Sequence, residues 1–249
     1  MNFLLYLLFG FLPSLIWLCY YLQKDNHPEP RIMIIKIFIY GMLIGPLAAL
    51  LQFIIAWIIH PSSIGQLFLN LNQRTIFGLI NLAIVAPITE EFCKYLVVKK
   101  KVFNNPNFDE PVDSMVYFVV TALGFAAVEN LLVFSALRNG PMTAMISNVA
   151  LRFISATLIH VLASATLGYF LAVAFFETKK RTTYFIKGFG LAILFHASYN
   201  YLVYLAWEQT LNQSLIITIL VLYLTFLSVL ISWQFKELCK KIAICKTKG

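Results

Sequence analysis

Charged side chains are scarce in this sequence. Aspartate, glutamate, lysine and arginine make up 12% of its 249 residues, whereas hydrophobic residues make up 60%. A soluble domain carries roughly 25% charged residues. The composition therefore excludes an ordinary soluble protein and indicates a chain that lies largely within a membrane.

Familiar cysteine and histidine signatures are also missing. The four cysteines form neither a C-x-x-C pair nor a zinc knuckle, so the sequence predicts no disulfide framework. No H-E-x-x-H occurs, which excludes the zincin class of metalloprotease. Internal repeats and low-complexity tracts are absent as well. We therefore expect residues 1–249 to form a single membrane domain.

Long apolar runs dominate what is present. A transmembrane helix needs about 20 mainly apolar residues, and the alternation typical of membrane strands is absent. The sequence therefore predicts an all-α polytopic membrane protein. Its seven expected spans are 2–22, 32–59, 75–98, 113–136, 144–176, 185–206 and 212–235. Two of them, 32–59 and 144–176, exceed one crossing, so we expect each to be tilted or to begin with a surface segment.

Basic residues gather in alternate connections between these spans. Fifteen of the 19 lysines and arginines lie in one set of connections, whereas the other set holds only Arg74 and Arg138. Cytoplasmic loops carry such an excess. The pattern predicts a cell-membrane protein with its N-terminus outside and its C-terminus in the cytoplasm. It also accounts for the net charge of +8 without nucleic-acid binding, which needs a basic soluble surface.

Ionisable residues interrupt four of the apolar spans. They are Glu90, Glu91 and Lys94; Glu129; Arg152 and His160; and His196, which is followed one turn later by Asn200. A charged group at membrane depth is costly unless it is paired inside the bundle, so each marks a functional site by default. Two adjacent carboxylates, Glu90 and Glu91, cannot both ionise easily in a low dielectric. This is a common way to prepare a general base.

Carboxylates and imidazoles together suit the hydrolysis of a peptide bond. The reaction needs an activated water, a group that polarises the carbonyl, and a proton donor. Histidine and glutamate can hold a divalent metal for this purpose, and a Glu–His pair can also activate water without one. A proton-coupled transporter would use the same residues as a relay, although we see no two corresponding halves. A non-catalytic scaffold or receptor is a third class.

The order of these motifs resembles the PrsW-type intramembrane proteases, which are related to the CAAX prenyl and bacteriocin-processing membrane proteases. The matching segments are 28–30, 86–94, 108–113, 124–130, Arg152, His160 and 195–200. The resemblance implies cleavage of a membrane-anchored protein, such as an anti-sigma factor cut on its extracytoplasmic side. Two positions depart from related patterns. Tyr95 stands where the prenyl-protease branch would carry arginine, and Ser114 stands where we expect glycine.

These residues can be given expected roles in an endopeptidase. Glu90 or Glu91 is the general base, and Lys94 compensates the charge of the acidic pair. Arg152 and Asn200 are the expected polarisers of the scissile carbonyl. The residues expected to hold the water or a divalent metal, with zinc as the first choice, are Glu129, His160 and His196.

The charge pattern makes a prediction about membrane topology. Cysteines introduced into 99–112, into 177–184 or after Phe235 should resist membrane-impermeant thiol reagents in intact cells, because these segments are expected in the cytoplasm. Labelling before and after permeabilisation measures this. Modification of 177–184 from outside would reverse the orientation.

Overall fold

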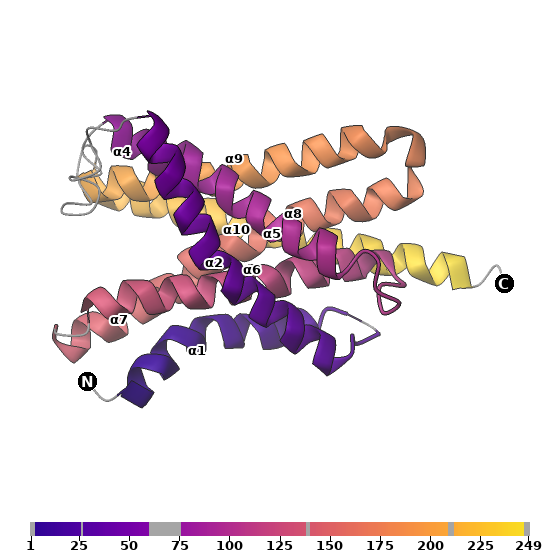
Figure 1. Cartoon of the computed structure of the whole chain (residues 1–249), viewed down its shortest axis with the longest axis horizontal. Coiled ribbons are helices and arrows are strands. Elements are labelled where there is room, and N and C mark those ends of the chain that lie inside the picture. Colours follow the sequence, from indigo (N-terminus) through magenta and orange to yellow (C-terminus); the bar gives the residue numbers. More distant parts are fainter. Residues whose placement is uncertain (1–2, 26, 60–75, 138–139, 209–211, 247–249) are drawn as a thin grey trace.

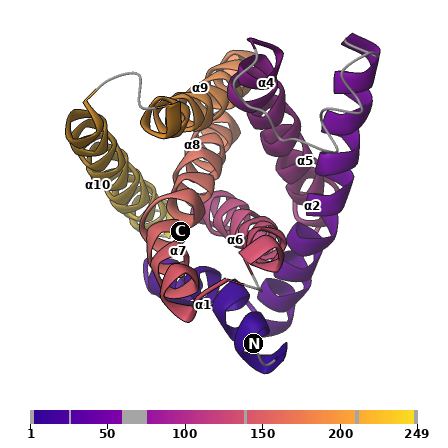
Figure 2. The same ribbon diagram turned by 90° about the vertical axis from the view of Figure 1, so that its left-hand side faces the viewer.

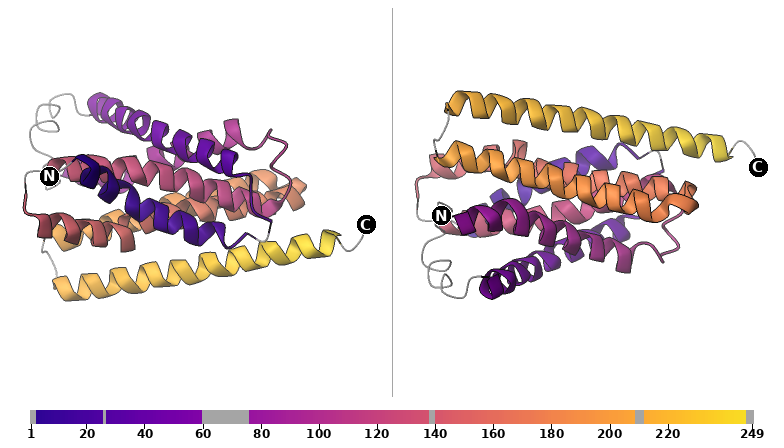
Figure 3. Two further views of the ribbon diagram at one scale, coloured as in Figure 1. Left: turned by 90° about the horizontal axis from the view of Figure 1, so that it is seen from below. Right: turned by 90° about the horizontal axis from the view of Figure 1, so that it is seen from above.

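The computed structural model describes residues 3–25, 27–59, 76–137, 140–208 and 212–246, and all of their regular structure is helical. The chain runs back and forth along the long axis of a helical bundle, so that α1 begins and α10 ends at opposite ends (Figures 1 and 3). The elements are α1 (Phe3–Leu22), α2 (Arg31–Ile59), α4 (Ile76–Ile80), η2 (Asn81–Val85), α5 (Ala86–Lys101), α6 (Pro111–Leu137), α7 (Met142–Ile154), α8 (Ala156–Phe176), η3 (Thr178–Lys180), α9 (Arg181–Glu208) and α10 (Gln213–Lys246).

The prediction of an all-α polytopic membrane protein is confirmed. Six stretches of the described helices are long and apolar enough to cross a membrane: Leu4–Leu22, Arg31–Ile59, Pro111–Ser135, Met142–Phe176, Thr178–Trp207 and Gln213–Lys240. The fourth of these is not one continuous helix, because the backbone of Ser155 leaves the helical conformation between α7 and α8. The remaining predicted span, 75–98, has its described part divided among α4, η2 and α5.

Pro87 follows a π-helical turn inside that span, which stays helical from Ile76 to Lys101. In the segment η2 the N–H of Ala86 donates to the carbonyl of Asn81 five residues back. In the same pattern the carbonyl of Leu82 would pair with residue 87, but proline has no N–H. Asn200 of α9 supplies the missing donor, with its Nδ2 2.9 Å from the Leu82 oxygen. The π-helical turn is thereby tied to α9.

Helices α6 and α8 form the centre of the bundle. The apolar windows of α6 and of the α7–α8 segment are 72% and 78% buried, against 17% to 22% for the other four. Figure 2 shows α6 with other helices around it. Large side chains on the outer helices, including Leu43 of α2 and Leu222 of α10, point away from the bundle and are 65% exposed each. Such an apolar exterior is suited to lipid.

Two glycines allow α2 and α6 to touch backbone to backbone. A Cβ added to Gly124 would lie 2.1 Å from the carbonyl oxygen of Phe38, and one added to Gly41 would lie 2.3 Å from that of Thr121. No side chain fits at either place. Small residues commonly permit this close packing of membrane helices, and here it brings α2 against the core.

Gly124→Ala should therefore destabilise the protein by about 1–3 kcal/mol, the usual cost of overpacking, because the contact is with backbone that cannot rotate away. Thermal unfolding in detergent micelles measures this. Gly190→Ala is the matched control, since an added Cβ there meets nothing within 4 Å. Equal melting temperatures for the two variants would contradict the packing argument.

Candidate functional site

The predicted site residues come together between five helices. Helix α5 contributes the acidic pair and Lys94, α6 contributes Glu129, and α7 contributes Arg152 from its last turn. Helices α8 and α9 contribute one histidine each, His160 and His196. Hydrogen bonds join most of these side chains, so the apolar helices enclose one connected polar network.

Glu91 is the most completely bonded member of the network. Its side chain is fully buried, and its Oε1 accepts hydrogen bonds from Lys94 Nζ at 2.6 Å and from His196 Nδ1 at 3.0 Å. Its Oε2 accepts a hydrogen bond from Ser164 Oγ at 2.7 Å. A carboxylate with this many donors is stabilised in its ionised form.

Glu90 has a free oxygen. Its Oε1 accepts a hydrogen bond from Gln52 Nε2 of α2 at 3.1 Å. Its Oε2 is buried and has no hydrogen-bond partner among the residues that the structure describes. That oxygen lies 3.8 Å from His160 Nδ1 and 3.7 Å from His196 Nε2. A buried acceptor without a donor is costly, and it therefore marks the space where a ligand would be bound.

Each histidine is oriented by a carboxylate that contacts the ring nitrogen facing away from Glu90. His160 Nε2 lies 2.5 Å from Glu129 Oε2, and Lys94 Nζ donates to His160 Nδ1 at 2.9 Å. His196 Nδ1 lies 3.0 Å from Glu91 Oε1. The network therefore assigns protons to His160 Nε2 and His196 Nδ1, which leaves His160 Nδ1 and His196 Nε2 as acceptors beside Glu90. A carboxylate behind each imidazole is typical of metal-binding histidines.

These atoms fit a divalent cation. Glu90, His160 and His196 each offer one ligand atom, and the three atoms lie within 4.8 Å of one another. With both imidazoles neutral, the network holds three carboxylates against the two cations Lys94 and Arg152, a formal charge of −1 that a cation would offset. An ion at His160 Nδ1 requires Lys94 to release that nitrogen, while its bond to Glu91 can remain.

Glu129 and Arg152 lie beside this group of three. Arg152 Nη2 donates to Glu129 Oε1 at 2.8 Å, and its Nε donates to Asn130 Oδ1. Both acceptors belong to α6, so the pair fixes the end of α7 against the core. Glu129 thus contacts the outer nitrogen of His160, whereas the sequence predicts that it holds the water or metal together with His160 and His196. Asn200, expected to polarise a carbonyl, is engaged with Leu82.

Sequence reasoning missed Gln52 as a member of the site. Gln52 is the only polar residue of α2 after Tyr40, and a lone amide in an apolar span is a signal that could have found it. Ser164, bonded to Glu91, gave a weaker signal, because serine often bonds its own helix backbone in apolar segments.

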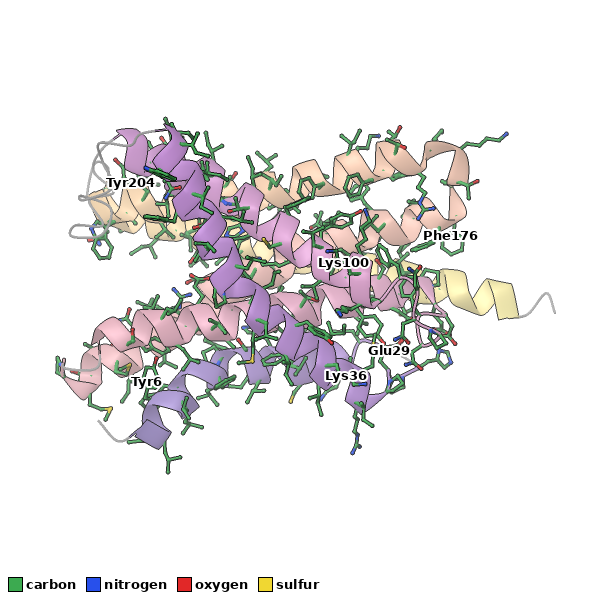
Figure 4. The ribbon with its side chains drawn as sticks, viewed as in Figure 1. Tyr6, Glu29, Lys36, Lys100, Phe176 and Tyr204 are labelled. Atoms are coloured by element: carbon green, nitrogen blue, oxygen red, sulfur yellow. The ribbon has the colours of Figure 1, made fainter. Side chains whose placement is uncertain are left out.

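The site is nearer to one end of the bundle. Along α6, Glu129 lies eight residues, or about 12 Å, before the end of the helix at Leu137, and about 27 Å after its start at Pro111. The other end carries Glu29, Lys36 and Lys100 (Figure 4). The site therefore lies away from the basic connections.

Comparison with known proteins shows which family the sequence matches. Residues 29–231 match the model of the PrsW family of intramembrane metalloproteases. The chain is 32% identical over 196 residues to Protease PrsW of Geobacillus kaustophilus, covering 78% of this chain and 77% of that protein. It is 26% identical to Protease PrsW of Clostridioides difficile, covering 87% of this chain and 86% of that protein. No solved structure matches the chain.

A second group of carboxylates lies at the opposite end. Asp25, Glu29 and Asp113 bring one oxygen each within 4.8 Å of one another. Burial raises the pKa of the Asp25 carboxyl, although the N–H of His27 bonded to its Oδ1 opposes this. Burial is also the main cause that raises the pKa of Glu29. Among the described residues this group contains no imidazole, and it lies outside the network described above.

The raised pKa of Asp25 predicts how stability depends on pH. A carboxyl whose folded-state pKa is raised stabilises the protein fully below its unfolded value of about 3.9, and this contribution is lost as pH rises through the folded value. Asp25→Asn should therefore raise the melting temperature at pH 7.5, and the gain should shrink towards zero near pH 4.

Melting curves in detergent across this pH range provide the measurement. Glu177→Gln is the control, because it removes an exposed carboxylate from a loop between α8 and α9. A gain for Asp25→Asn that is the same at pH 4 and pH 7.5 would show that titration of Asp25 is not its cause.

Proposed function

Because the chain belongs to the PrsW family of intramembrane metalloproteases, we propose that it hydrolyses membrane-anchored proteins at the group formed by Glu90, His160 and His196. The chain is a multi-pass protein of the cell membrane, and its family makes it a membrane protease. The observation that carries the proposed site is the free Oε2 of Glu90, which faces two imidazole nitrogens.

The three residues would hold a divalent ion through Glu90 Oε2, His160 Nδ1 and His196 Nε2. Zinc in such a site lowers the pKa of a bound water to about 7 and polarises a carbonyl. Carboxylate and imidazole ligands suit zinc, although they do not exclude other divalent ions. Gln52 holds the second oxygen of Glu90, so that the free oxygen keeps its direction.

The surrounding charges keep these groups in the protonation states that the reaction needs. Glu91 and Glu129 each accept a hydrogen bond from one nitrogen of a histidine, which leaves the other nitrogen of each ring as an acceptor. Lys94 and Arg152 balance these two carboxylates. Because both oxygens of Glu91 already accept hydrogen bonds, whereas one oxygen of Glu90 accepts none from the described residues, we assign the role of the base or ligand in the acidic pair to Glu90.

Cleavage is proposed on the extracytoplasmic side. The excess of basic residues in alternate connections supports an N-terminus outside and a C-terminus in the cytoplasm. The site lies nearer the end of the bundle that lacks these basic connections, which supports a cut near the outer surface. The resemblance described above implies an anti-sigma factor as substrate, and a single-span anti-sigma factor is therefore the first substrate to assay.

Glu90→Gln should reduce cleavage at least about a hundredfold, because the amide is nearly isosteric but cannot act as a base or as an anionic ligand. The variant should still insert and fold, since a neutral amide is less costly than a carboxylate at this depth. The wild-type protein should contain one divalent ion per chain, which Glu90→Gln and His160→Ala should each reduce. Elemental analysis and cleavage of a single-span substrate in vesicles measure the two effects.

His27→Ala is the matched control, because it removes a histidine from a loop outside the spans and should change neither the metal content nor the rate. Strong chelators should abolish cleavage, and added metal should restore it. Active protein without stoichiometric metal, at a rate that chelators leave unchanged, would overturn the metal assignment. Normal turnover by Glu90→Gln would overturn the site itself.

A further inference from the structure

A groove runs beside the site between α10 and the helices α7, α8 and α9, with a volume of about 1270 Å³. Figure 2 shows α10 at the outer side of the bundle, and Figure 3 shows it running along the whole bundle. The groove is lined largely by apolar side chains, and some of the largest are well exposed. Among them are Leu151 of α7 at 58% and Val229 of α10 at 66%.

The wall of the groove that α10 forms is as long as a membrane is thick, whereas α9 lines the groove from Tyr199 to Trp207. On α10 its lining extends from Ile216 to Lys236, twenty residues or about 30 Å at the helical rise. That length equals the hydrocarbon thickness of a bilayer. Trp207 and Trp233 both line it, with exposures of 73% and 55%, and tryptophan is typical of the two membrane interfaces.

The groove is continuous with the site. Ala156 lines it one helical turn before His160, and Asn200 lines it one turn after His196. Residues four apart lie on the same helix face, so α8 and α9 turn the same faces towards the groove and the metal-binding group. Arg152, which is bonded to Glu129, lines the groove as well.

Small residues mark the part of α10 that a helix could approach most closely. Ser228 and Ser232 both line the groove and are four residues apart, which is the spacing of the small-xxx-small pattern found where membrane helices pack.

We propose that this groove is the docking site for the transmembrane helix of the protein substrate, which α10 holds against α7 and α9 so that it passes beside Glu90, His160 and His196. The proposal rests on the proposed function for the identity of the occupant. The length of the groove and its continuity with the site favour a spanning helix over a small ligand, which would need neither.

Site-specific photo-crosslinking tests the docking without requiring proteolysis. Benzoylphenylalanine replaces Val229, which lines the groove, or Phe226, which is similarly exposed at 63% but does not line it. Each full-length Glu90→Gln protein is reconstituted in phosphatidylethanolamine–phosphatidylglycerol vesicles. The probe is a biotinylated single-span peptide of about 21 leucines, alanines and serines, with serines four residues apart and lysines at both ends.

We expect peptide adducts at Val229 to exceed those at Phe226 at least tenfold. The double variant Ser228→Leu, Ser232→Leu should reduce the Val229 adducts to the Phe226 level, and Ser232→Leu alone should reduce them partly. Thr218→Leu is the matched control, because Thr218 is exposed on α10 but does not line the groove. Unchanged melting temperatures show that these variants remain folded.

Peptide adducts that are equal at both positions, or absent at Val229, would overturn the proposal. Adducts of lipid mass alone at Val229 would show that the groove holds acyl chains and would overturn it too. Failure of the proposed function gives a different result, because crosslinking at Val229 would then persist in a protein that binds no metal and cleaves no substrate.

Discussion

The site depends on the contacts of the Lys94 ammonium group, which is completely buried between the carboxylate of Glu91 and the imidazole of His160. This group joins α5 to α8 through His160, while its partner Glu91 reaches Ser164 of α8 and His196 of α9. Removing one partner of a buried ion pair typically costs about 3–5 kcal/mol, because the other charge is left without compensation. Lys94 therefore favours the ionised form of Glu91 and joins α5 to α8 until a ligand takes its place at His160 Nδ1.

Helices α6 and α8 are largely buried at the centre of the bundle, whereas α10 lies at its outer side and is largely exposed. Helices α6 and α8 are almost entirely enclosed, and the histidine and carboxylates on them are held by several bonds each. A groove lies between α10 and the helices α7, α8 and α9. Chemistry at membrane depth requires fixed ligands and also a route for a bulky apolar substrate. The predicted site residues lie on α5 to α9, whereas α10 supplies only a wall of the groove.

The sequence predicted the class of fold and the membership of the site better than the roles within it. Apolar runs and buried charges are local signals, so the spans and the convergence of Glu90, Glu91, His160 and His196 followed from them. The different hydrogen bonding of Glu90 and Glu91 depends on Gln52 and Ser164, which come from distant parts of the chain. Glu129 was expected beside the ligand, yet which nitrogen of His160 it contacts is set by the orientation of the ring, which spacing along one helix cannot reveal.

The π-helical turn before the acidic pair connects two residues that are far apart in the sequence. Pro87 leaves the carbonyl of Leu82 without a backbone donor, and Asn200 supplies one. If residue 87 could donate an N–H, the amide of Asn200 would have no function at this carbonyl; if residue 200 lost its amide, Pro87 would leave a buried acceptor unpaired. The two positions are therefore energetically coupled. Whether a substitution at residue 87 is tolerated depends on the residue at position 200, and the reverse holds as well. The two positions are therefore expected to change together during evolution.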